Sequence, residues 1–230
     1  MGLFSKISEL FHNNDKFDIE EYNKYNEAKI EEFKDRYDLT NINSIRAIPI
    51  SEAKRYPDGG KSVVYMPEQI LNRQATEYKK EKKYDLAIAC LLKANELYPH
   101  SFYTYQRENY ERVVDIMILA GKFEDAKKEH ETLNKKYGSR LQELKHLQDV
   151  AEENDWEGRE SYQKRVIDPY ISESNDKEEY YWLLEHFPKL APKSFGGYRK
   201  MKKMNSDNYK KIVDEIEKLG YKIEELKFWY

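Results

Sequence analysis

The sequence predicts an all-α protein, and three observations support this fold class. Apolar residues recur at three- and four-residue steps through most of the chain, which is the period of an amphipathic helix. Capping residues bracket these segments, with short polar residues or Pro before them and Gly or Pro behind them. Of the 230 residues, 39% are hydrophobic and 36% are charged, a balance that suits helices with long solvated faces. The 20 Tyr and 9 Phe predict a core built largely of aromatic rings.

Residues 1–65 are predicted to form an N-terminal helical arm followed by an irregular connector. An aspartate N-cap and regularly spaced apolar residues predict a helix over about Ile19–Tyr37. The helical period is then lost, because Pro49 and a Tyr-Pro-Asp-Gly-Gly turn interrupt the chain. A small β-hairpin that pairs residues 44–50 with residues 62–65 is an alternative for this connector.

Near the N-terminus, apolar residues also stand at helical spacing: Leu3, Phe4, Ile7, Leu10 and Phe11. This stripe predicts a short helix that packs back on the core, docks on a partner or lies on a membrane surface. Lys6 is the only basic side chain in it, so the electrostatic part of membrane binding would be weak.

Residues 66–99 carry the strongest helical signals of the chain. Pro67 suits the first position of a helix that continues to about Lys82, and a second helix is predicted over Tyr84–Leu97. Pro99 ends that second helix, because proline disfavours the helical conformation before it. Three small residues would let the two helices approach closely: Ala75, Ala87 and Ala94.

The order of large, small and aromatic residues in this pair is specific: Leu71, Ala75, Tyr78, Tyr84, Ala87, Leu91, Ala94 and Pro99. A second pass of the pattern follows: Tyr110, Val113, Val114, Met117, Gly121, Phe123, Ala126 and Leu133. Over residues 66–137 the chain therefore resembles the tetratricopeptide repeat, although the second pass lacks the closing Pro and is longer than the usual period of roughly 34 residues. The resemblance implies stacked antiparallel helical hairpins.

Because about three repeats are normally needed to bury the stacked faces, the flanking helices are expected to act as caps. Gly138 and the apolar residues after it predict a capping helix over about residues 139–154. Residues 66–155 are thus expected to form a tetratricopeptide-like core that includes this capping helix.

Residues 156–230 are predicted to form a small C-terminal helical module. Residues 156–170 are typical of a polar, partly helical linker, and the turn-forming residues 172–176 indicate a boundary. Three helices should follow, starting at Asn175 or Asp176, close to Met201 and after Ser206.

No stretch carries a catalytic or cofactor motif, and we expect a protein that is not an enzyme and holds no cofactor or metal. No two of the five His stand at a helical ligand spacing, so His130 is expected to be a packed structural residue and Cys90 a packed thiol. The segment from Gly59 to Ser62 is similar to the end of a phosphate loop, but Arg55 stands where that loop needs a glycine.

The charge and cysteine content predict a cytoplasmic protein. The net charge of -3 gives no global field that would steer the chain to nucleic acid or to an anionic membrane. The single Cys suits a reducing compartment, and the N-terminus lacks the features of a secretory signal. No transmembrane segment is expected, because no apolar run is long enough to span a bilayer.

The first function hypothesis is a non-enzymatic adaptor or scaffold that binds a peptide or a partner helix. Stacked helical hairpins offer a concave groove for such a partner. The candidate groove residues come from the leading helices of the two hairpins: Asn72, Glu77 and Tyr78 from the first, and Tyr103, Gln106 and Tyr110 from the second. Whether residues 41–65 fill this groove stays open.

The second hypothesis is a nucleic-acid-binding or regulatory protein that uses a local basic patch. Between residues 198 and 211 six basic residues stand against the single acidic Asp207. Two short helices separated by a turn loosely resemble a helix-turn-helix there. The residues that would contact phosphates are Arg199, Lys200, Lys202, Lys203, Lys210 and Lys211.

Overall fold

The structure is a computed structural model that describes residues 19–54, 66–101, 103–154 and 157–223. Every regular element in these ranges is helical, which confirms the predicted all-α class. The elements are α2 (Ile19–Arg36), α3 (Ile42–Ala47), η1 (Ile50–Lys54), α4 (Pro67–Lys80), α5 (Tyr84–Leu97), η3 (Tyr98–His100), α6 (Arg107–Leu119), α7 (Phe123–Tyr137), α8 (Arg140–Glu153), α9 (Arg159–Tyr162), η4 (Gln163–Ile167), α10 (Asp168–His186), α11 (Phe195–Lys203) and α12 (Asp207–Lys218).

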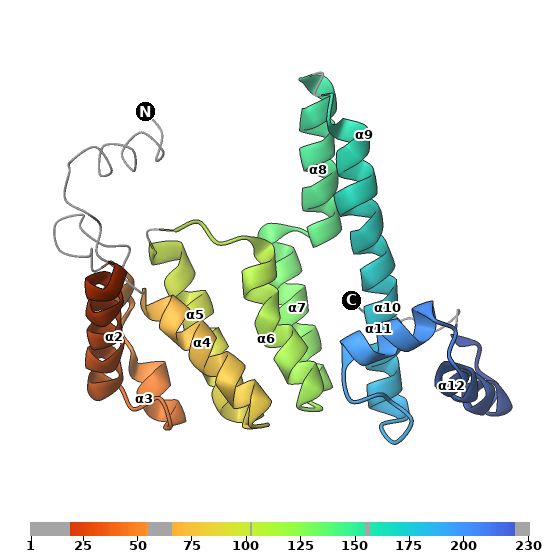
Figure 1. Cartoon of the computed structure of the whole chain (residues 1–230), viewed down its shortest axis with the longest axis horizontal. Coiled ribbons are helices and arrows are strands. Elements are labelled where there is room, and N and C mark those ends of the chain that lie inside the picture. Colours follow the sequence, from red (N-terminus) through yellow and green to blue (C-terminus); the bar gives the residue numbers. More distant parts are fainter. Residues whose placement is uncertain (1–18, 55–65, 102, 155–156, 224–230) are drawn as a thin grey trace.

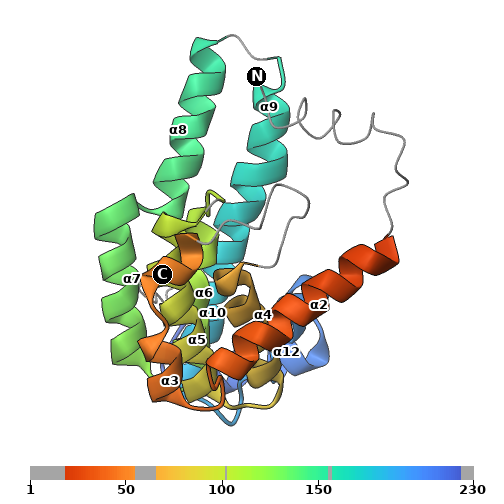
Figure 2. The same ribbon diagram turned by 90° about the vertical axis from the view of Figure 1, so that its left-hand side faces the viewer.

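The helices of residues 19–137 form two layers. Helices α2, α4 and α6 lie side by side in one layer, and α3, α5 and α7 lie in the other (Figures 1 and 2). The closest packing joins α4 to α5 and α6 to α7, and α5 also packs on α6 and α3. The described helices thus continue one another as a row of pairs, with α2 and α3 at one end.

Small side chains at the helix crossings explain how α4 and α5 come so close. Ala75, Ala87 and Ala94 are almost completely buried, as their spacing predicts. Leu91 and Tyr78 fill the space around them. Cys90 is also buried, and burial raises the pKa of its thiol to about 12, so it is the packed thiol expected from the sequence.

The turns inside the two helical pairs have the same backbone geometry. Lys82 and Gly121 both adopt left-handed conformations, with φ of 59° and 73°. The Lys83 N–H donates to the Tyr78 carbonyl at 2.8 Å. In the second turn, the Lys122 N–H donates to the Met117 carbonyl at 2.9 Å. Both turns therefore close their first helix with the same C-terminal hydrogen bond, as the parallel between the two stretches of sequence predicts.

The buried side chain of Arg107 holds α6 and α7 together. Arg107, at the start of α6, donates from its guanidinium to the Leu133 carbonyl at 3.1 Å and also to the Gly138 carbonyl at the end of α7. It donates to the Asn134 side chain and pairs with Glu111 at 2.9 Å. Because the last carbonyls of a helix have no partner within the helix, this side chain serves as the C-terminal cap of α7.

The described part of the connector after α2 contains two short helices, α3 and η1. The Asn41 side chain accepts hydrogen bonds from the Asn43 and Ser44 N–H groups at 2.9 and 3.3 Å and so starts α3. Ile45 is fully buried on this helix. The alternative β-hairpin is therefore wrong for residues 44–50, because Asn41 is an N-cap that favours a helical turn before Pro49. Residues 62–65 lie outside the described residues, as do the N-terminal stripe and the aspartate N-cap of the first helix.

The largest departure from the sequence-based expectation is a long helix in the C-terminal part. Residues 159–186 are helical without interruption, through α9, the π-helical segment η4 and α10. A linker up to residue 170 and a helix start at Asn175 or Asp176 are therefore wrong. Asp176 faces inward, 6% exposed, because Arg199 and Lys202 from α11 pair with it at 3.1 and 2.9 Å. The division of the chain at residue 156 stays a prediction.

Candidate docking groove

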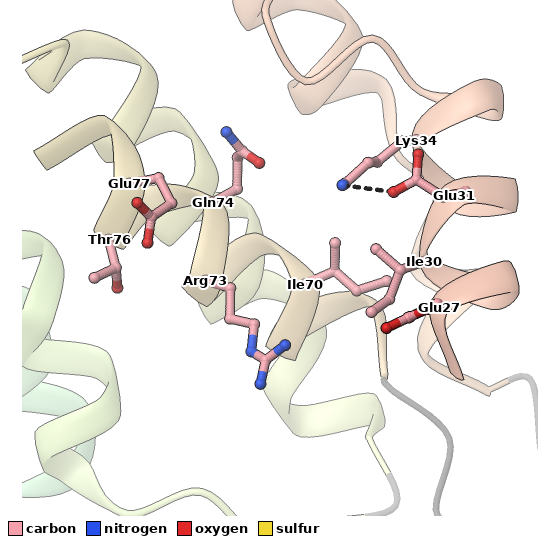
Figure 3. A pocket seen from close by; sticks show the side chains of 9 residues that line it. All are labelled: Glu27, Ile30, Glu31, Lys34, Ile70, Arg73, Gln74, Thr76 and Glu77. Atoms are coloured by element: carbon pink, nitrogen blue, oxygen red, sulfur yellow. Dashed lines mark hydrogen bonds and ion pairs between the residues drawn. The ribbon is translucent and has the colours of Figure 1, made fainter. Parts of the chain in front are cut away.

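An open groove of about 460 Å³ lies between α2 and α4. Its floor is apolar, because Ile30 of α2 and Ile70 of α4 point toward one another across it (Figure 3). Ile70 is buried and Ile30 is half-buried against the core. The polar lining residues are Glu27, Glu31, Lys34, Arg73, Gln74, Thr76 and Glu77.

The two walls of this groove carry a small excess of negative charge. Three carboxylates line it against two cations, Lys34 and Arg73. Lys34 already pairs with Glu31 at 2.8 Å, as Figure 3 shows, and Glu77 pairs with Lys80 at 2.8 Å. These pairs are solvent-exposed, so each contributes little to stability. The rim is therefore polar and slightly acidic, and the floor is apolar.

Side chains of the protein itself form hydrogen bonds across the space between the neighbouring helices α4 and α6. The Asn72 amide donates to the Tyr98 hydroxyl at 2.7 Å and accepts from Arg112 at 2.6 Å. Arg112 also donates to the Thr76 hydroxyl at 3.1 Å. Asn72, expected to face a partner, is instead a bridge between helices, because a cation from the next pair reaches it.

The six residues predicted for the groove do not meet on one surface. Tyr78 is buried and donates its hydroxyl to the Leu39 carbonyl at 2.8 Å, and Tyr110 is buried against the Tyr98 ring at 4.9 Å between centroids. Gln106 is exposed and begins α6, and Tyr103 is half-buried in the preceding turn. Of the six, only Glu77 lines the groove between α2 and α4.

The described part of the connector does not occupy the groove. Residues 41–54 contribute none of its lining side chains. Instead, α3 and η1 pack against α5 in the other layer. Residues 41–54 therefore lie away from the groove between α2 and α4.

The basic residues of the second hypothesis divide into two groups. Arg199 and Lys202 face α10, where they form ion pairs with Glu173 at 2.7 Å and with Glu179 at 2.6 Å, in addition to Asp176. Lys210 lies 3.8 Å from Asp207. The exposed remainder is Lys200, Lys203 and Lys211. Half of the predicted basic patch is therefore engaged with carboxylates of the same chain.

This division predicts different effects for two adjacent lysines. Lys202→Met should lower the free energy of unfolding by about 1.5–3 kcal/mol, because it removes the cation paired with the half-buried Glu179 carboxylate and one of the two cations paired with the buried Asp176 carboxylate. Lys200→Met, on the exposed side of the same helix, should change it by less than about 0.5 kcal/mol. Urea unfolding followed by circular dichroism measures both, and equal effects would contradict the assignment of Lys202 to the α10–α11 contact.

A cluster of titratable side chains lies between α6, α7 and α10. His130 is 7% exposed, and burial and the Arg107 charge lower the pKa of its imidazole to about 4. Burial raises the pKa of the Glu111 carboxyl, 4.0 Å away. Asp115 accepts a 2.7 Å hydrogen bond from the Tyr181 hydroxyl of α10. The cluster ties α10 to the row of pairs, and His130 is a packed residue as predicted.

One buried carboxylate was not singled out by the sequence. Glu68 is completely buried at the start of α4 and accepts hydrogen bonds from the Tyr105 hydroxyl at 3.0 Å and from the Ser101 hydroxyl. These hydrogen bonds hold the connection between α5 and α6 in place. Burial raises the pKa of the Tyr105 phenol. Within the described ranges no group of three or more His, Cys, Asp or Glu is placed to hold a metal ion.

No protein-family model, curated protein or solved structure matches the chain. None of the helices described is both long enough and apolar enough to cross a lipid bilayer.

Proposed function

We propose that the protein is a non-enzymatic interaction protein, and that the groove between α2 and α4 binds an amphipathic helix of a protein partner. The observation that carries the proposal is the open, apolar-floored groove itself, flanked by two helices. Helix-in-groove recognition uses such a surface, with apolar anchors of the ligand on the floor and polar residues along the rim.

The charge of the groove favours a partner helix with basic residues beside its apolar stripe. Glu27 is exposed at one end, and Glu31 and Glu77 lie farther along the walls. A lysine or arginine of the ligand near these carboxylates would guide the encounter more than it would add affinity. In the basic patch, Arg199 and Lys202 are only 23% and 28% exposed and are paired with carboxylates of α10, so they are less accessible to a ligand than the exposed groove carboxylates.

We also propose that α2–α7 is a tetratricopeptide-like array of three helical pairs, with α2 and α3 as a shortened first pair. The matching turns after α4 and α6 support this view. So does the number of pairs, since three repeats are what a stacked core of this kind needs. In such an array the leading helices line the concave side, and α2 and α4, which line the groove, would be two of these leading helices. The cytoplasmic location stays a prediction.

A phage-displayed library of random 16-residue peptides tests the binding proposal without a known partner. We expect enriched peptides to have apolar residues at positions i, i+3 or i+4 and i+7, with Lys or Arg beside them. Their affinity should fall at least about tenfold for Ile30→Glu, which places a charge on the groove floor.

Ile50→Glu is the matched control, because Ile50 is an exposed isoleucine of η1 that does not line the groove. It should leave peptide binding unchanged. Reversing the charge of Glu27 and Glu31 should weaken basic peptides further. The proposal is overturned if no enriched peptide responds to Ile30→Glu, or if Ile50→Glu has the same effect.

A further inference from the structure

A second surface lies far from the groove, on a projecting arm. Helix α8 and the segment formed by α9 and η4 extend together beyond the two layers, side by side (Figures 1 and 2). They pack mainly on one another. The side chains of these elements that are fully buried are few: Leu144, Ala151 and Ile167. Helices in proteins are stabilised mostly by packing of an apolar face. A two-helix arm that buries so few side chains therefore lacks part of the packing that would stabilise it.

The apolar stripe of α8 is wider than its single neighbour covers. Leu147 and Val150 stand three residues apart and are therefore adjacent on the helix surface. They are 47% and 39% exposed, next to the buried Leu144 and Ala151. The surface of α8 at Leu147 and Val150 is thus apolar and faces solvent, and another helix could cover it.

Helix α8 and η4 expose side chains of opposite charge on the arm. Exposed residues of α8 include Asp149, Glu152 and Glu153; η4 exposes Lys164 and Arg165, and α9 exposes Glu160 nearer the tip. At 1.5 Å per residue, Asp149 lies about 8 Å below the tip on one helix and Lys164 about 9 Å below it on the other. If two arms lie side by side and point the same way, the acidic α8 of each faces the basic segment of the other at the same level.

We propose that two copies of the chain associate through their arms, with a two-fold axis along the arms, to form a four-helix bundle. Each copy places Leu147 and Val150 against the other copy's α9 and η4. Such an interface is isologous, so one patch serves both copies. The charge pattern selects a second copy over an unrelated helix. The inference does not depend on the groove, which is built from α2 and α4.

Sedimentation equilibrium of the full chain tests the proposal. The protein should have twice its monomer mass of 27.7 kDa. The double variant Leu147→Glu, Val150→Glu should be monomeric while its far-ultraviolet circular dichroism spectrum stays unchanged, because both side chains are exposed in the single chain. Leu219→Glu, at a 57% exposed leucine after α12, is the matched control and should remain dimeric.

Charge reversal separates a specific bundle from nonspecific association. Lys164→Glu with Arg165→Glu should raise the dimer dissociation constant at least about tenfold, as should Asp149→Lys with Glu152→Lys. Combining all four changes should restore the dimer, because each acidic face again meets a basic one. A chain that is monomeric up to about 0.1 mM, or a dimer that is insensitive to Leu147→Glu and Val150→Glu, would overturn the proposal.

Discussion

Replacing Arg107 by methionine should lower the free energy of unfolding by about 3–5 kcal/mol, because removing one partner of a buried ion pair leaves the other charge uncompensated. Its side chain is 2% exposed and pairs with Glu111, which is itself largely buried. The change also leaves the Leu133 and Gly138 carbonyls at the end of α7 without their donor. Methionine keeps much of the volume, so the loss reports the charge and the hydrogen bonds. Chemical denaturation gives the value.

Arg46→Met is the control for this experiment. Arg46 is exposed on α3, and its replacement should cost less than about 0.5 kcal/mol. If Arg107→Met is equally mild, Arg107 does not cap α7, and the account of how α6 and α7 are held together fails.

Replacing Asn175 by proline should destabilise the protein by about 3 kcal/mol or more, because proline inside a helix removes a hydrogen bond and clashes with the preceding turn. Asn175 is exposed near the middle of α10, so its side chain contributes little. The prediction separates two views of this stretch, since a proline in a loop would be tolerated. Thermal and urea unfolding measure the difference.

Asn175→Ala is the matched control, because alanine favours a helix more than asparagine does. It should leave stability unchanged or raise it slightly. If the proline variant is as stable as the alanine variant, residues 172–176 form the boundary that their composition indicates, and α10 is not continuous there.

The helical pairs could be predicted from the sequence because their signals are local. Pro67 starts a helix, Gly138 ends one, and Ala87 at a crossing marks close packing. The matching turns at Lys82 and Gly121 belong to the same class of signal. Each of these residues acts through its own backbone or its immediate neighbours, so spacing is sufficient to identify it.

The long helix could not be predicted, because its cause is distant in the sequence. Ser172, Asn175 and Asp176 are typical of turns, and their local preference opposes a helix. Arg199 and Lys202 reach Asp176 from α11 and stabilise it in the helical position. Tertiary contacts of this kind override local preference.

The structure does not bring the six predicted groove residues together on one surface, and the reason is similar. Spacing identifies Asn72 as a leading-helix residue, but it cannot show that Arg112 reaches its side chain from α6. Ile30 belonged to the stripe that predicted α2, and only the arrangement of helices brings it to Ile70. A more useful signal would have been Asn41, whose capping preference reveals the helix α3 before α4.

The most direct test of the docking groove is amide hydrogen exchange of the protein with and without the strongest-binding peptide from the library. The account predicts slower exchange in α2 and α4 on binding, with α8 and α11–α12 unchanged, because the peptide covers Ile30 and Ile70. Slowing confined to α11–α12 or to the arm, with α2 and α4 unaffected, would contradict it.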